Sequence, residues 1–146
     1  MLVLEGVFLL EQGLKNAQKI RQAFKARRYK HVVTDVPAIL TEVGGKERGE
    51  LRYYLSESLF KLGRLREAAL SYDALLKEKS TPTHQAKIQL RMGDCFRHLG
   101  DKKTALVYYS EFIDRFPKSE EAKKAEAYLK TLQMKTGDKS LEIVEK

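Results

Sequence analysis

Apolar residues at the start of the chain fall on alternating steps of three and four, the pattern of one face of a helix. This seam consists of Val3, Val7, Leu10, Leu14, Ala17 and Phe24, with Arg21 interrupting it. It predicts one long helix over residues 2–28 with a narrow apolar stripe. Gly6 and Gly13 weaken this helix by about 1 kcal/mol each relative to alanine.

The same segment carries apolar side chains outside the seam, at Leu2, Leu4, Phe8 and Leu9. Two interpretations are open. The helix folds over the neighbouring part of the chain as a cap, or residues 2–10 exceed what that part can cover. In the second case Val3, Val7, Phe8 and Leu10 form a patch for self-association or for a partner helix.

Two later segments repeat one pattern, KLGRLREAALSYDALL around Gly63 and HLGDKKTALVYYSEFI around Gly100. In the segment before each glycine lies a small residue, Ser56 or Gly93. Five residues after each glycine comes an alanine, and nine residues after it comes a tyrosine. These are Ala68 and Tyr72 in the first segment and Ala105 and Tyr109 in the second. The small residue and the alanine allow two helices to approach closely, and the glycine allows a tight turn between them. The pattern predicts helical hairpins at about 49–80 and 83–117.

These residues resemble the tetratricopeptide repeat family. The match is carried by Met92, Gly93, Phe96, Gly100, Ala105, Tyr109 and Pro117. A degenerate earlier unit at about 14–43 has Val32 and Val36 at the alanine and aromatic positions, with Pro37 inside its second helix, where a kink is expected. Residues 119–135 read as a solvating cap helix. The resemblance, over about residues 14–135, implies a right-handed α-solenoid with a long N-terminal helix, as one domain over 1–135 followed by a flexible tail at 136–146.

The run FIDRFPKSEEAKKAEAYLK is similar to the bacterial cell-envelope branch of this family. That branch includes the Tol-Pal-associated periplasmic protein and a lipoprotein of the outer-membrane barrel-assembly machinery. The resemblance implies a non-enzymatic scaffold that holds partner proteins in a larger complex.

The resemblance also implies which side chains face a partner, because the first helix of each unit lines the concave face. By position these are Arg21, Lys25, Tyr53, Glu57, Lys61, Lys87, Asp94, Arg97 and His98, with Arg91 beside them. The predicted groove is basic with aromatic patches, and two carboxylates interrupt it. An acidic or amphipathic protein segment is therefore the expected ligand.

The net charge of +8 raises the alternative of electrostatic binding to nucleic acid or to an anionic membrane. However, the basic residues are spread evenly, with nine in residues 1–50, nine in 51–100 and ten in 101–146. Nucleic-acid binding requires a clustered stripe, so nucleic acid is not expected as the main partner, nor is direct membrane contact.

No motif for catalysis, a cofactor or a metal is present, and the three histidines lack ligand-like spacing, so a non-enzymatic role without cofactors is expected. Cys95, the single cysteine, is expected to be a small packing residue. The opening MLVLEGVFLL lacks the features of a signal peptide, which predicts a cytoplasmic protein if the chain is complete. A periplasmic or cell-envelope location is the alternative if the chain is a fragment.

Overall fold

The structure is a computed structural model that describes residues 2–78 and 82–136. Within these ranges it consists of seven α-helices and contains no strand, which confirms the predicted all-helical fold. The helices are α1 (Leu2–Lys25), α2 (Tyr29–Ile39), α3 (Gly45–Lys61), α4 (Leu65–Lys77), α5 (Pro82–His98), α6 (Lys102–Arg115) and α7 (Glu120–Thr136). The chain divides into two compact units, Met1–Pro82 and Thr83–Lys146, and each is described by itself.

Some helix boundaries differ from the predicted ranges. The first helix ends at Lys25 rather than at residue 28, and α3 begins at Gly45, four residues before the predicted hairpin at 49–80. The predicted tail at 136–146 lies outside the described residues, apart from Thr136 at the end of α7. The single domain over 1–135 stays a prediction, because the compactness of two units does not test whether they fold independently.

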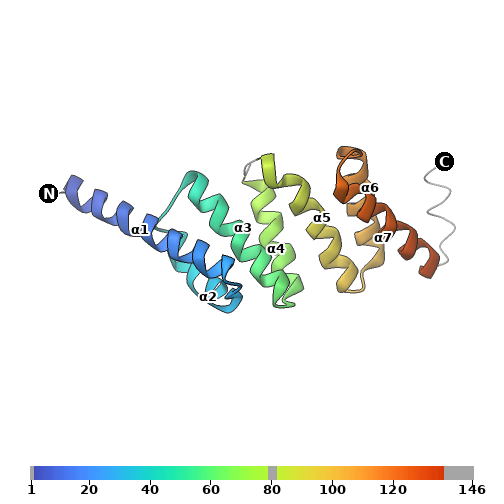
Figure 1. Cartoon of the computed structure of the whole chain (residues 1–146), viewed down its shortest axis with the longest axis horizontal. Coiled ribbons are helices and arrows are strands. Elements are labelled where there is room, and N and C mark those ends of the chain that lie inside the picture. The colour runs from blue at the N-terminus through green and yellow to red at the C-terminus, as the bar shows by residue number, and fades with distance from the viewer. Residues whose placement is uncertain (1, 79–81, 137–146) are drawn as a thin grey trace. The chain divides into compact units, whose positions relative to one another are not determined.

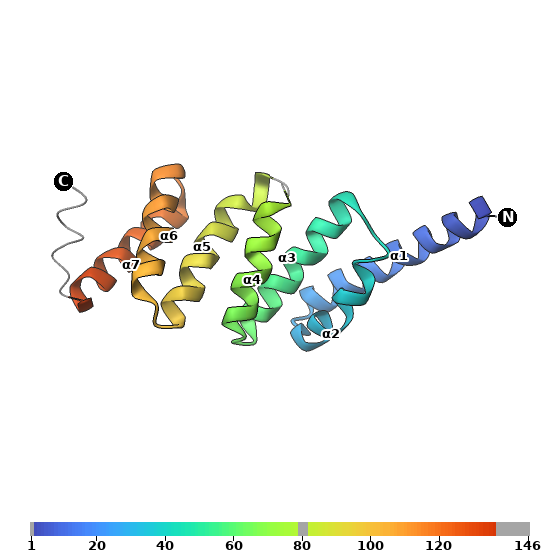
Figure 2. The same ribbon diagram turned by 180° about the vertical axis from the view of Figure 1, so that it is seen from behind.

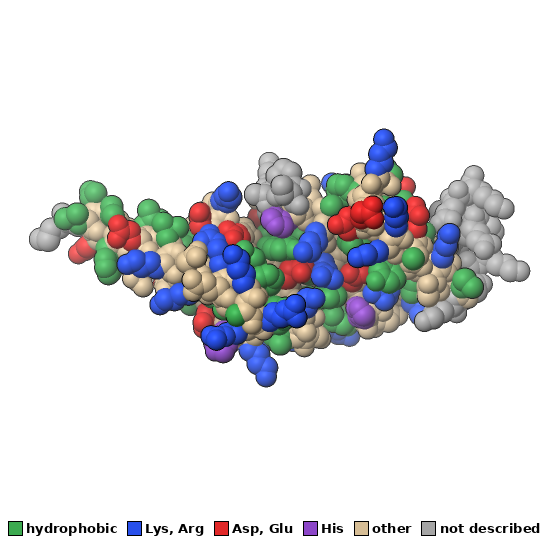
Figure 3. Space-filling model, viewed as in Figure 1, with side chains coloured by type: hydrophobic (Ala, Val, Ile, Leu, Met, Phe, Trp, Pro, Cys, Tyr) green, Lys and Arg blue, Asp and Glu red, His purple; other side chains and the backbone are tan. Residues whose placement is uncertain are grey.

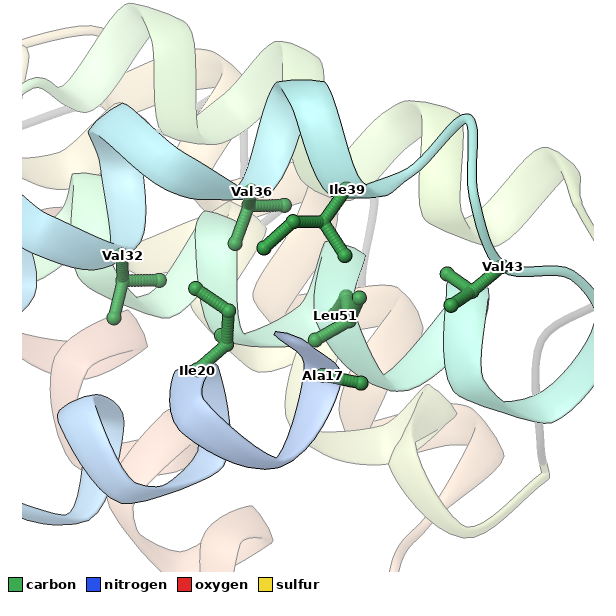
Figure 4. Close-up of a cluster of buried hydrophobic side chains, with 7 residues drawn as sticks. All are labelled: Ala17, Ile20, Val32, Val36, Ile39, Val43 and Leu51. Atoms are coloured by element: carbon green, nitrogen blue, oxygen red, sulfur yellow. The ribbon is translucent and has the colours of Figure 1, made fainter. Parts of the chain in front are cut away.

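In the first unit α1, α2 and α3 pack against one another, and α4 packs on α3 (Figure 1). Val32, Val36 and Ile39 lie three and four residues apart, so they share one face of α2. This face meets α1 and α3 in a buried cluster completed by Ala17, Ile20, Val43 and Leu51 (Figure 4). Pro37 lies inside α2, as the sequence indicated, and is exposed.

In the second unit α5, α6 and α7 alternate in direction (Figure 2). The core of the unit contains Ala105, Leu106, Tyr109 and Phe112 from α6 and Ala122, Ala125 and Leu132 from α7. The predicted alanines of both complete repeats, Ala68 and Ala105, are fully buried. Their role as close-packing residues is thereby confirmed.

All three hairpins turn through the same backbone conformation. Gly63 and Gly100 have φ values of 78° and 83°, and Arg27 takes the equivalent place with a φ of 60°. At each turn the next amide donates to a carbonyl five residues earlier, as from Arg64 to Leu59 and from Asp101 to Phe96. This is the Schellman motif, which needs a left-handed residue after the helix. The hairpin of α1 and α2 lacks the glycine yet keeps the turn.

These turns predict opposite effects for two substitutions. We expect Gly100→Ala to lower the free energy of unfolding by about 1–2 kcal/mol, because a side chain is strained in the left-handed conformation. Arg27→Gly relieves that strain, and since glycine also loses more entropy on folding, a gain below about 1 kcal/mol is expected. Urea unfolding followed by circular dichroism measures both. An Arg27→Gly loss as large as that of Gly100→Ala would contradict the shared motif.

Candidate protein-interaction surfaces

A buried tyrosine and a buried carboxylate form the same pair in both complete repeats. The Tyr109 hydroxyl donates a hydrogen bond to Asp94 Oδ1 at 2.5 Å, and the Tyr72 hydroxyl donates to Glu57 Oε1. In each pair the acid stands 15 residues before the tyrosine, and all four side chains are buried. The pair therefore ties the second helix of each hairpin to the first.

In the second unit this pair also holds an arginine. Arg97 Nε donates to the Tyr109 hydroxyl at 3.0 Å, and Arg97 Nη2 lies 3.7 Å from Asp94 Oδ1. The guanidinium carbon is 4.0 Å from the ring centre of Tyr128 on α7, a cation–π contact. Burial and the hydrogen bond to Asp94 raise the pKa of Tyr109. The hydroxyl therefore keeps its proton and donates to the carboxylate at neutral pH.

The predicted groove residues of α5 separate into an inner and an outer group. Asp94 is buried, which corrects the prediction that it faces the open groove. It points inward because its Oδ1 accepts the hydrogen bond of the buried Tyr109 hydroxyl. Arg91 and Arg97 are partly buried, with Arg91 Nη1 3.5 Å from Asp94 Oδ2. Lys87 and His98 are exposed, and Figure 3 shows basic side chains and histidines along α5.

In the first unit Arg21 is engaged within the unit. Its Nε and Nη2 donate to the two oxygens of Glu50 at 2.8 and 3.0 Å, a bidentate ion pair between α1 and α3. The hydrogen bonds raise the pKa of Arg21 and lower that of Glu50. The Tyr54 hydroxyl donates to the same carboxylate at 2.7 Å, and burial together with this bond raises the pKa of Tyr54 to about 12.

The remaining predicted groove residues of this unit differ in exposure. Tyr53 and Glu57 are buried rather than facing an open groove, and Glu57 accepts the hydrogen bond of Tyr72. Lys25 and Lys61 are exposed. Sequence reasoning missed Glu50 as the partner of Arg21, and no sequence signal pairs two residues 29 positions apart.

The first half of α1 presents an apolar surface. Val3 is 79% exposed, Phe8 64% and Leu10 55%, and Val7, Leu4, Leu9 and Leu14 are also exposed. Figure 3 shows these green side chains gathered at the N-terminal end. The packed part of the helix begins at Gly13, whose backbone lies against the carbonyl oxygen of Glu42. The cap interpretation is therefore wrong for residues 3–10, and the patch interpretation has the exposure that it requires.

The described residues contain no group of histidine, cysteine and acidic side chains that could hold a metal ion. Among the helices at residues 2–78 and 82–136, none has the length and apolarity needed to cross a bilayer. Cys95 is fully buried, in agreement with the packing role expected for it.

The repeat geometry described above can be compared with known proteins. Residues 88–119 match the family model of the tetratricopeptide repeat. The matched segment contains the turn at Gly100, the buried Ala105 and Tyr109, and Pro117. A solved structure of the Arabidopsis OM64 TPR domain is similar with a TM-score of 0.68 and 17% identity, over 84% of this chain and 98% of that domain. No curated protein matches the chain.

Both comparisons support the tetratricopeptide repeat resemblance. The family match covers most of the hairpin predicted at 83–117, and the structural likeness extends the fold over most of the chain. At this level of identity the likeness shows the fold and not the ligand. The cell-envelope subtype suggested by residues 112–130 stays a prediction.

Proposed function

We propose that this chain is a non-enzymatic scaffold that binds an acidic or amphipathic segment of a partner protein on the α5 surface. Tetratricopeptide repeats in general serve as protein-interaction modules, which supports the class of function. The observation that carries the proposal is the arrangement of Arg97 in the second unit.

Arg97 is held in place before any partner binds. Its Nε donates to the Tyr109 hydroxyl, and its guanidinium carbon lies over the Tyr128 ring. Its Nη2 lies 3.7 Å from Asp94 Oδ1 and 3.5 Å from His98 Nε2, and the side chain is partly exposed. A partner carboxylate at this surface can accept a hydrogen bond from a guanidinium that is already oriented. An arginine that is already ordered loses little side-chain entropy on binding, so its contribution to affinity is large for one residue.

The neighbouring charges extend the same surface. Lys87, Arg91 and His98 follow steps of four and seven residues along α5, so they share one face of that helix. Asp94 lies on the same face but is buried. Its carboxylate accepts the hydrogen bond of Tyr109 and lies beside the arginines, so it adds little negative charge to the exposed surface. The exposed part of the face is therefore basic, and an acidic segment complements it.

The test uses synthetic acidic peptides with interspersed apolar residues, and neutral peptides of equal length. Lys87 is the side chain to change, because it is exposed, whereas changes at Arg97 also disturb Tyr109. We expect Lys87→Glu to weaken binding of the acidic peptides by about fivefold or more in fluorescence anisotropy. Lys103→Glu on α6, also exposed and with the same charge change, is the matched control and is expected to bind as the parent does.

Equal weakening by both variants, or no binding by any acidic peptide, overturns the proposal. A duplex DNA of generic sequence and vesicles containing anionic lipid serve as competing ligands at low salt. Binding of either one more tightly than the peptides would favour the electrostatic alternative in place of the scaffold.

We place this scaffold in a larger protein assembly, and its compartment and cell-envelope subtype stay predictions from the sequence. Immunodetection in fractionated source cells tests them. Recovery with the periplasm or envelope supports the subtype, and recovery in the cytoplasm alone overturns it.

A further inference from the structure

The exposed apolar residues of α1 form a stripe with a defined geometry. Val3, Val7, Leu10 and Leu14 are separated by four, three and four residues. At 3.6 residues per turn they lie within about 60° of one another around the helix axis. This is the spacing of the a and d positions of a coiled coil, which need an apolar helix as a partner.

Within the described residues of the first unit, no helix covers this stripe. The α2 helix has 11 residues against 24 in α1, so α2 covers less than half of the length of α1. In Figure 1 the N-terminal half of α1 extends beyond α2 and α3. The base of the projecting part is fixed, because Gly13 lies against the Glu42 carbonyl and Asn16 Nδ2 donates to Glu42 Oε2 at 3.0 Å. The stripe is therefore presented on an anchored helix.

We propose that this stripe pairs with the same stripe of a second copy of the chain, with the two α1 helices antiparallel. The spacing of four, three and four reads the same in both directions, so a two-fold axis superimposes the stripe on itself. Each of the four layers then contains one valine and one leucine: Val3 meets Leu14 of the second copy, and Val7 meets Leu10. A parallel pair has two valine layers and two leucine layers, which differ in volume and pack less evenly.

The position of the folded body supports this orientation as well. The rest of the first unit begins to pack on α1 at Gly13, at one end of the stripe. The antiparallel arrangement places the two bodies at opposite ends of the helix pair. The parallel arrangement brings both to the same end, where they compete for space.

The experiment measures the mass of the full chain by sedimentation equilibrium and light scattering from about 1 to 200 μM, the range expected for a small apolar interface. A concentration-dependent dimer is expected. Leu10→Glu lies in the stripe and is expected to raise the dissociation constant by about 100-fold or more, because it places a charge between apolar side chains. Leu9→Glu is the matched control, since Leu9 is also exposed but lies about 130° from the centre of the stripe, and the dimer is expected to persist.

A monomer throughout this range, or a dimer that Leu9→Glu and Leu10→Glu weaken equally, overturns the proposal. The orientation is tested by oxidising mixtures of Val7→Cys and Leu10→Cys proteins, with native Cys95 buried in the core. Preferred cross-linking between the two different variants supports the antiparallel pair. Preferred cross-linking of each variant with itself contradicts it. Because these readouts need no peptide ligand, a failure of the dimer proposal is distinguishable from a failure of the proposed peptide binding on the α5 surface.

Discussion

Gly93→Ala is expected to lower the free energy of unfolding by about 2 kcal/mol, although alanine is the better helix former by about 1 kcal/mol. A Cβ at Gly93 would lie 2.6 and 2.8 Å from two ring carbons of Tyr109. That ring is fully buried, and its hydroxyl is fixed by Asp94 and Arg97, so it has no room to withdraw. The added methyl group therefore forces α5 and α6 apart. Chemical denaturation of the parent and the variant measures the difference.

Gly6→Ala is the matched control for this prediction. Gly6 is also inside a helix, but a Cβ there meets no atom within 4 Å. The helix preference then acts alone, and a change between zero and a gain of about 1 kcal/mol is expected. A neutral or stabilising Gly93→Ala would show that the ring can move and would refute the tight crossing.

The preceding repeat indicates how the loss can be relieved. There the small residue is Ser56 rather than glycine, and the acid is Glu57 rather than the shorter Asp94. Because glutamate is longer by one methylene, its carboxylate can accept from the tyrosine hydroxyl when the two helices lie farther apart. We therefore expect Asp94→Glu to restore at least half of the loss in the Gly93→Ala background, measured as a double-mutant cycle. Strictly additive losses would contradict this coupling.

The turn, alanine and tyrosine positions could be predicted from the sequence because their roles are local. Each is set by its distance from Gly63 or Gly100 along a hairpin whose geometry repeats. The apolar seam of α1 could also be predicted from the sequence. The sequence did not show whether other helices cover this seam, because that depends on how far α2 extends along α1, and α2 ends at Ile39.

The side chains that face outward on the first helices were harder to predict. The family positions place Glu57 and Asp94 toward the groove, but they take no account of the tyrosine hydroxyls that need an acceptor. The spacing of 15 residues between acid and tyrosine is present in both repeats and was the available signal. Arg21 and Glu50 meet only in the folded unit, and no local pattern joins them.

Tyr109→Phe is expected to lower the free energy of unfolding by about 2–3 kcal/mol at neutral pH. The change removes one oxygen and keeps the ring, so packing is retained. Asp94 Oδ1 loses its 2.5 Å donor, and Arg97 Nε loses its acceptor at 3.0 Å. A buried carboxylate without its donor costs more than an ordinary hydrogen bond, because water does not replace the lost partner.

The same hydroxyl makes stability depend on alkaline pH. Because its pKa is raised in the folded chain, Tyr109 keeps its proton at pH values where the unfolded chain has lost it. Its contribution is therefore complete below about pH 10, the ordinary tyrosine value, and declines as the pH rises beyond that value. Tyr54, with a pKa raised to about 12, adds a decline of the same sign. Urea unfolding at a series of pH values from about 8 to 11 is expected to show a steeper alkaline loss for the parent than for Tyr109→Phe.

Tyr108→Phe separates the hydrogen bond from a general effect of removing a tyrosine hydroxyl. Tyr108 is the adjacent residue on α6, partly exposed and stacked with Phe96 at 5.5 Å between ring centres. A change below about 1 kcal/mol is expected there, since water can solvate a partly exposed site. Equal losses at both positions, or an unchanged alkaline slope in Tyr109→Phe, would show that Asp94 does not depend on this donor. In that case Arg97 would also lack the fixed orientation on which its proposed role in binding rests.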